Sequence, residues 1–279
     1  MNNIEESYDE VQRIKYELWS EDFNVELTAV ASEDILVAEG DSWFDYPPGL
    51  DILDNLKREF GYKIYKVSEA GDTIENMAFG TEIRNNFSRR IPPLVETLDA
   101  IARHRPKVFL LSGGGNDITG LRLESFINHK DSGLPLLRQS YAEYILFTVF
   151  KIAYEYIIEQ VWQIDPSIHI ITHGYGNSIP DGRATINLPF GFKFIGPWLR
   201  PALAKKNITN PLEAEGLIAS LIDMFNEMLQ QLDQENQRFH YIDLRGLIQR
   251  EDWVNELHLY NFAYRRVAGI FHELIQALQ

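Results

Sequence analysis

Four short segments of the sequence carry the residue types that acyl-transfer chemistry needs. They contribute a serine hydroxyl at Ser42, a backbone N–H at Gly71, a side-chain amide at Asn116 and an imidazole at His258. A serine hydroxyl is a weak nucleophile until an adjacent base removes its proton, and histidine suits that task near neutral pH. N–H donors can stabilise the negative charge that develops on a carbonyl oxygen under attack. Together the four groups predict cleavage of an ester or a related acyl bond.

Each segment taken alone has a simpler explanation. The Gly-Asp-Ser at 40–42 suits a turn followed by a helix N-cap, and Gly71 suits a tight turn that only glycine tolerates. The glycines before Asn116 lack the Lys-Ser/Thr ending of a phosphate-binding loop, and a lone histidine such as His258 more often packs or lies at the surface. The catalytic interpretation is favoured by the conjunction, because all four segments follow successive predicted strands.

Short apolar runs alternate with longer amphipathic stretches along the chain. This alternation predicts a parallel sheet covered by helices on both faces, because two parallel strands need a helical crossover between them. In such a sheet ligands bind beyond the carboxyl ends of the strands, which is where the four segments lie. The predicted strands are 35–38, 63–67, 108–111, 168–172 and 239–243, and the predicted helices are 50–60, 73–86, 93–104, 136–164, 212–233 and 261–278.

The four segments resemble the sequence blocks of a known family. Gly-Asp-Ser at 40–42, Gly-Asp-Thr at 71–73, Gly-Gly-Asn-Asp at 114–117 and the C-terminal His258 are similar to the four blocks that give the SGNH/GDSL hydrolases their name. Four blocks in the right order are far more specific than any one of them. The resemblance implies a flavodoxin-like three-layer α/β/α sandwich with a parallel sheet of about five strands, in agreement with the alternation.

The resemblance also implies a role for each matching residue. Ser42 is expected to be the nucleophile and His258 its general base. The backbone N–H groups of Ser42 and Gly71 and the amide of Asn116 are expected to form the oxyanion hole. The activity implied is that of a serine esterase, with lipase, thioesterase, deacetylase and acyltransferase as variants of the same chemistry.

One position departs from the family pattern. An aspartate commonly lies three residues before the histidine and holds the imidazole in the productive tautomer, but this chain has Asn255 there. Asn255 could orient the ring through its amide oxygen, or Asp252 or Glu256 could supply a charge. A backbone carbonyl could also orient the histidine of a Ser-His dyad. We favour Asn255 or Asp252. In a serine protease the Asp-to-Asn change lowers turnover by about 10⁴. The alternative hypothesis is therefore a catalytically inactive protein that keeps the fold and binds an acylated or glycan ligand.

The composition favours a cytoplasmic enzyme that acts on a small molecule. The chain has 279 residues and a formal net charge of -15, which argues against nucleic acid or an anionic membrane as its main partner. It contains no cysteine, so disulfides and thiolate metal ligands are excluded. The N-terminus lacks the pattern of a signal peptide, and no apolar stretch approaches the ~20 residues of a membrane span. We expect a small ester or acylated substrate, no cofactor and no metal.

We expect a single domain, 1–279, with two additions to the regular alternation. Residues 1–34 are predicted to form an N-terminal extension. Residues 174–210 are predicted to form an insertion after the fourth strand, rich in aromatic residues such as Trp198, which either forms a lid or acyl pocket or packs as a satellite core. His173, directly before the insertion, could touch the substrate or be an ordinary loop residue.

Overall fold

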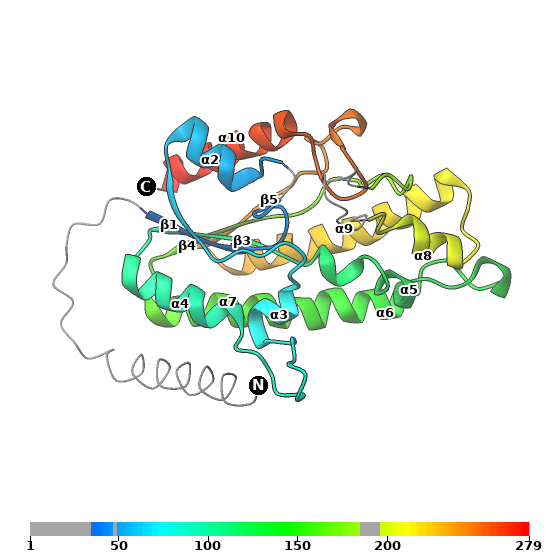
Figure 1. Cartoon of the computed structure of the whole chain (residues 1–279), viewed down its shortest axis with the longest axis horizontal. Helices are drawn as coiled ribbons and strands as arrows, with labels where there is room; N and C mark the ends of the chain where they lie inside the picture. Colours follow the sequence, from blue (N-terminus) through cyan, green and yellow to red (C-terminus); the bar gives the residue numbers. More distant parts are fainter. Residues whose placement is uncertain (1–34, 47–48, 185–195, 279) are drawn as a thin grey trace. The chain divides into compact units, whose positions relative to one another are not determined.

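A sheet of five parallel strands lies at the centre of the structure (Figure 1). Its order is β2 (Lys63–Lys66), β1 (Ile35–Gly40), β3 (Val108–Ser112), β4 (His169–His173) and β5 (Phe239–Ile242). This order is flavodoxin-like, with the topological switch point between β1 and β3. The three inner strands are almost entirely buried, which explains their continuous apolar sequences. The predicted fold class and all five predicted strands are confirmed.

Helices cover both faces of the sheet, as Figure 1 shows. On one face α2 (Ile52–Phe60) packs against α10 (Asn261–Leu278). On the other face α4 (Pro93–His104) and α9 (Pro211–Glu235) each contact α7 (Lys151–Ile164). The result is the three-layer arrangement that the sequence predicts, and it leaves the carboxyl ends of the strands at one edge of the sheet.

The helix predicted over 73–86 is shorter than expected. Helix α3 (Ile74–Phe79) begins where the Thr73 side chain accepts the Asn76 N–H, and it ends at Gly80, which has a left-handed φ of 66°. A left-handed glycine is a common helix terminator because it has no Cβ to clash. The side-chain oxygen Oδ1 of Asn76 then accepts the backbone N–H groups of Thr81 and Glu82, so the chain leaves the helix there.

The stretch predicted as one helix over 136–164 contains three helical segments in succession. They are α6 (Gln139–Tyr144), a π-helical stretch (Ile145–Phe150) and α7. Two short helices, α5 (Leu123–Phe126) and α8 (Arg200–Lys205), were not predicted, because four to six residues show too little periodicity to recognise. Three 3-10 turns, 116–118, 130–132 and 250–252, complete the regular structure.

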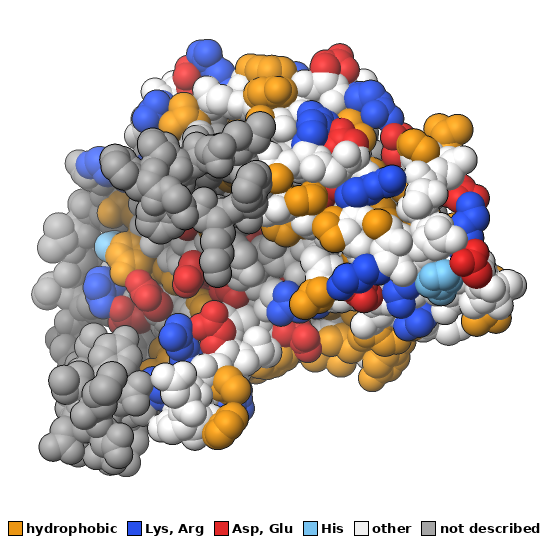
Figure 2. Space-filling model, turned by 45° about the vertical axis from the view of Figure 1, so that its right-hand side comes forward, with side chains coloured by type: hydrophobic (Ala, Val, Ile, Leu, Met, Phe, Trp, Pro, Cys, Tyr) orange, Lys and Arg blue, Asp and Glu red, His pale blue; other side chains and the backbone are white. Residues whose placement is uncertain are grey.

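The structure describes residues 35–46, 49–184 and 196–278, all within one unit, Asp34–Gln279. The predicted N-terminal extension and the centre of the predicted insertion lie outside the described residues. On the face drawn in Figure 2, Lys and Arg side chains are interspersed with Asp and Glu side chains. In the described ranges, no helix has both the length and the apolar character that crossing a bilayer requires.

Candidate active site

The structure brings Ser42 and His258 together although they lie far apart in the chain. The Ser42 Oγ is 2.8 Å from Nε2 of His258. Ser42 occupies the turn directly after β1, where the Asp41 carboxylate accepts the Trp43 N–H at 3.0 Å. The Trp43 indole N–H donates to the Leu257 carbonyl at 3.1 Å, so the turn that carries Ser42 is tied to the loop that carries His258. The predicted pairing of serine and histidine is present in the geometry.

Asn255 holds the other side of the imidazole. Its Oδ1 lies 3.1 Å from Nδ1 of His258 and also accepts the backbone N–H groups of Leu257 and His258, each at 2.9 Å. An amide oxygen only accepts, so the hydrogen of the neutral ring is on Nδ1 and the lone pair of Nε2 faces Ser42. This is the tautomer in which His258 can take the serine proton.

The surroundings of His258 keep the ring uncharged. Its ring stacks on Tyr46 at 4.3 Å, and the edge of Trp198 lies at 5.4 Å. Burial lowers the pKa of His258 from 6.5 to about 3. Its ring hydrogen bonds within the described ranges go to Ser42 and Asn255, neither of which carries a charge. The base is therefore neutral over the whole physiological range, and the imidazolium formed during a reaction has no carboxylate beside it.

The two acidic candidates near His258 serve other purposes. The buried Asp252 carboxylate accepts the Gln249 N–H at 2.6 Å and pairs with Arg266, which closes the loop before the histidine. The carboxylate of the fully buried Glu256 accepts the backbone N–H groups of Gly182, Trp198, Leu199 and Arg200. Glu256 thus fastens both described ends of the predicted insertion to the histidine loop. The geometry favours Asn255 over Asp252 as the residue that orients the ring.

Two of the three predicted oxyanion donors, Gly71 and Asn116, lie on neighbouring loops; the third is the backbone N–H of Ser42 itself. Asn116 follows β3, and its Nδ2 donates to the Asp72 carbonyl at 2.8 Å, which ties its loop to the Gly71 turn. An amide has two hydrogens, so this bond leaves Asn116 a second donor. Gly71 has a left-handed φ of 94°, a conformation that favours glycine. Asn116 lines the cavity next to Ser42, whereas Gly71 is not among the lining residues.

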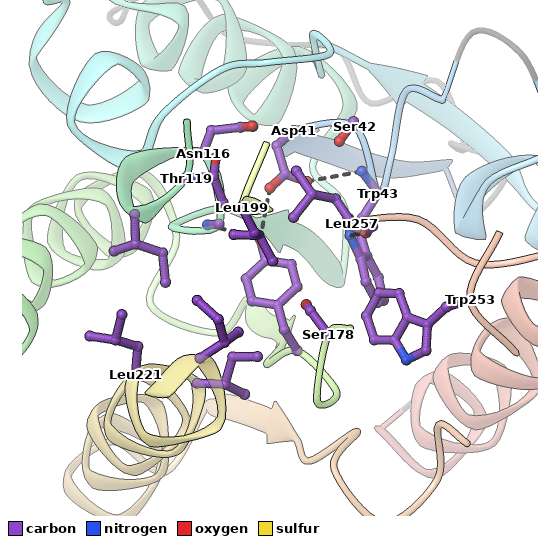
Figure 3. A pocket seen from close by; sticks show the side chains of 15 residues that line it. Asp41, Ser42, Trp43, Asn116, Thr119, Ser178, Leu199, Leu221, Trp253 and Leu257 are labelled. Atoms are coloured by element: carbon purple, nitrogen blue, oxygen red, sulfur yellow. Dashed lines mark hydrogen bonds between the residues drawn. The ribbon is translucent and has the colours of Figure 1, made fainter. Parts of the chain in front are cut away.

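A cavity of about 50 Å³ opens beside Ser42. Figure 3 shows Ser42 and Asn116 at one end and Leu221 of α9 at the other. The remaining wall is mainly apolar and includes Ile118, Leu199, Ile218, Ile222, Trp253 and Leu257. A cavity of this type next to a serine hydroxyl is suited to an apolar group of a small ligand. The α9 side chains were predicted only as a helix face, since an apolar stripe does not reveal whether it faces a core or a cavity.

A second set of serine, histidine and aspartate lies beneath the first. The Ser112 Oγ donates to Asp41 at 2.8 Å and lies 3.0 Å from Nε2 of His173. Ser112 and His173 are fully buried, and His173 stacks on Trp43 at 5.0 Å. Asp41 also accepts the Tyr175 hydroxyl at 2.7 Å. Both alternatives left open for His173, contact with the substrate and an ordinary loop residue, are wrong, because His173 is the last residue of β4 and its side chain is fully buried in this network.

The comparisons with known proteins concern the fold. No family model matches the sequence. No curated protein matches it either. Solved structures that match include the lipase Lip_vut3 from a goat rumen metagenome, with 14% identity, a TM-score of 0.50 and coverage of 86% of this chain and 97% of the other. A "possible lipase" from Chitinophaga pinensis matches with 12% identity, a TM-score of 0.52 and coverage of 88% and 99%.

A third match is the periplasmic domain of a Salmonella lipopolysaccharide acetyltransferase, with 14% identity, a TM-score of 0.50 and coverage of 87% and 84%. A structure described as a putative GDSL-like lipase, from Parabacteroides merdae, matches as well. The chain therefore has the SGNH/GDSL hydrolase fold, as its four sequence blocks predict. Within the described part of the chain, no group of three or more His, Asp or Glu is placed to hold a metal ion.

Proposed function

We propose that the protein is a serine esterase with Ser42 as nucleophile and His258 as general base. The observation that carries this proposal is the 2.8 Å contact between Oγ and Nε2 at the mouth of a cavity. Ser42 is half-buried and lines that cavity, so an ester can reach the hydroxyl. The fold and the lipase-like structures that match are consistent with this chemistry but are too distant to assign it.

The reaction would proceed in two steps. Ser42 Oγ attacks the ester carbonyl carbon while its proton passes to Nε2 of His258, and the charge on the carbonyl oxygen is stabilised by the N–H groups of Ser42 and Gly71 and by Asn116. The C–O bond to the alcohol then breaks, and His258 returns the proton to the leaving oxygen. A water molecule then attacks the acyl carbon while His258 takes its proton, the bond between that carbon and Ser42 Oγ breaks, and His258 returns the proton to Oγ as the carboxylic acid leaves.

Asn255 would orient His258 without adding charge. Its Oδ1 fixes the Nδ1–H tautomer, which is the positioning half of the role that an aspartate plays. The electrostatic half, stabilisation of the imidazolium, is missing. We therefore propose a slow esterase. The missing charge also motivates the second candidate, a protein that binds an acylated ligand without cleaving it.

Hydrolysis of p-nitrophenyl acetate by purified protein would test the proposal. Ser42→Ala is expected to lower kcat by about 10⁴ or more, because the attacking atom is lost. Ser220→Ala, which changes an exposed serine on α9, is the matched control and should leave the rate unchanged. Equal rates for the wild type and Ser42→Ala would contradict the esterase proposal. A wild-type rate no higher than that of buffer would favour the binding protein.

A further inference from the structure

The cavity beside Ser42 lies on the acyl side of the proposed reaction. The leaving oxygen must receive a proton from His258, so the alcohol lies on the side of that ring. His258 is not among the residues that line the cavity. Ser42 and Asn116 do line it, at the end where the carbonyl group would lie (Figure 3). The substituent that enters the cavity is therefore the one attached to the carbonyl carbon.

The size of the cavity limits this substituent. Its volume is about 50 Å³, whereas a dry protein cavity of about 150 Å³ holds one benzene molecule. One third of that volume corresponds to about two of the six benzene carbons, so the cavity has room for about two or three carbons beyond the carbonyl carbon. We propose, on the basis of the esterase function above, that the protein selects esters of short, uncharged acyl groups, from acetyl to butyryl, and that α9 sets the upper limit.

The end wall of the cavity is a fixed helix. Ile218, Leu221 and Ile222 are spaced so that they share one face of α9, and all three line the cavity. The next turn of α9 is anchored by Asn226, which is fully buried and donates to the Tyr175 carbonyl at 3.1 Å. A longer acyl chain would have to displace the helix or its side chains, and closely packed interiors resist such changes.

The charge of the cavity wall restricts the acyl group further. Asp41 is the acidic residue of the lining, and no lysine, arginine or histidine is present among the lining residues of the described chain. The Asp41 oxygens are already engaged by the Trp43 N–H and the hydroxyls of Ser112 and Tyr175. An acyl chain ending in a carboxylate would find no cation here and would lose its hydration.

A chain-length series would test the proposal. We would measure kcat/KM for the p-nitrophenyl esters of acetate, butyrate, hexanoate, octanoate and decanoate, and for a half-ester of glutarate. The wild type is expected to be fastest on acetate or butyrate, to lose about 10-fold or more by octanoate, and to cleave the glutarate ester at least about 10-fold more slowly than butyrate.

Leu221→Ala should move the maximum towards hexanoate, with a gain of about 10-fold on that ester, because it lengthens the cavity. The matched control is Leu212→Ala, which truncates an exposed leucine on the same helix and should leave the profile unchanged. If Leu221→Ala does not fold, Ile222→Val should give a smaller shift in the same direction.

The outcomes separate this inference from the function on which it rests. Suppose that the protein hydrolyses esters and that this activity depends on Ser42. An unshifted chain-length profile in a folded Leu221→Ala variant, or a wild-type preference for decanoate, would then overturn the acyl-pocket assignment alone. Failure to cleave any ester in the series, together with failure of a fluorophosphonate to label Ser42, would overturn both proposals.

Discussion

Two serines lie beside a histidine in this molecule, and their surroundings differ in two respects. Ser42 is half-buried and lines a cavity, whereas Ser112 is fully buried. At Ser42 the imidazole lies between the hydroxyl and Asn255, so the ring can relay a proton. At Ser112 the hydroxyl itself lies between the imidazole and Asp41. Access and the order of contacts, more than residue type, distinguish the proposed nucleophile from the buried hydroxyl of Ser112.

The buried network of Ser112, His173 and Asp41 holds the turn that carries Ser42. Asp41 is the residue before Ser42, and its carboxylate holds the nucleophile turn through the Trp43 N–H. The same carboxylate binds Tyr175, whose hydroxyl accepts the Gly115 N–H next to Asn116. The network therefore connects the serine turn with the loop that carries the predicted oxyanion donor. The two sets therefore differ in charge as well as in order: the buried set holds the Asp41 carboxylate on the side of the hydroxyl, whereas the Ser42–His258 pair has the uncharged Asn255 on the far side of the imidazole.

The first prediction concerns the charge of the residue that orients His258. Asn255→Asp would keep the acceptor at Nδ1 of His258 and place a negative charge beside the imidazolium formed during the reaction. We expect kcat for p-nitrophenyl acetate at pH 8 to rise by about 10- to 100-fold, a part of the factor of about 10⁴ that the reverse change removes in a serine protease. Asn255→Ala is the comparison variant and should be slower than the wild type. A decrease in Asn255→Asp, with the fold intact, would contradict the role assigned to Asn255.

The second prediction concerns pH. The neutral form of His258 is the active base, and burial lowers its pKa to about 3, so activity should be lost only as the pH falls towards that value. Between pH 8 and 5.5 the wild-type kcat/KM should stay flat, whereas a histidine with the ordinary pKa of 6.5 would lose about 10-fold at pH 5.5. In Asn255→Asp the new carboxylate raises the pKa, so the loss should begin at higher pH. A wild-type midpoint near 6.5 would contradict the assignment of a buried, uncharged base.

The third prediction separates the two serines by stability. Ser112→Ala leaves buried polar groups of Asp41 and His173 without their common partner, and it should lower the free energy of unfolding by about 1–3 kcal/mol. The loss of kcat should stay within about threefold, because Ser112 is fully buried and does not line the cavity. Ser42→Ala removes one hydrogen bond, to Nε2 of the buried His258, and should lower the unfolding free energy by about 1 kcal/mol or less. Urea unfolding of both variants would measure this, and a stability loss in Ser42→Ala larger than that in Ser112→Ala would reverse the comparison.

Much of the fold could be predicted because it depends on local pattern. Apolar runs bounded by turn residues located every strand, and the position of Ser42 and Asn116 directly after strands indicated the edge at which they would meet. The end of α3 at Gly80 was missed, because a glycine inside a helical pattern can be tolerated or can terminate the helix. The side-chain hydrogen bonds of Asn76 to the residues that follow decide between these outcomes.

The site could be predicted less completely, because some of its features depend on contacts between distant parts of the chain. His173 ends a strand much as Ser42 follows one, yet its side chain turns inward to Ser112. Asn255 and Asp252 were equally plausible partners of His258 until the loop geometry directed Asp252 to Arg266. The roles of Gly71 and of the predicted lid stay predictions.

Intact-mass analysis after treatment with a fluorophosphonate tests the central claim most directly, since the reagent needs only an activated serine and not the natural substrate. We would compare the wild type, Ser42→Ala and Ser112→Ala. The account predicts one adduct on the wild type, one adduct on Ser112→Ala and none on Ser42→Ala. An adduct that persists in Ser42→Ala, or one that disappears in a folded Ser112→Ala variant, would contradict the assignment of Ser42 as the nucleophile.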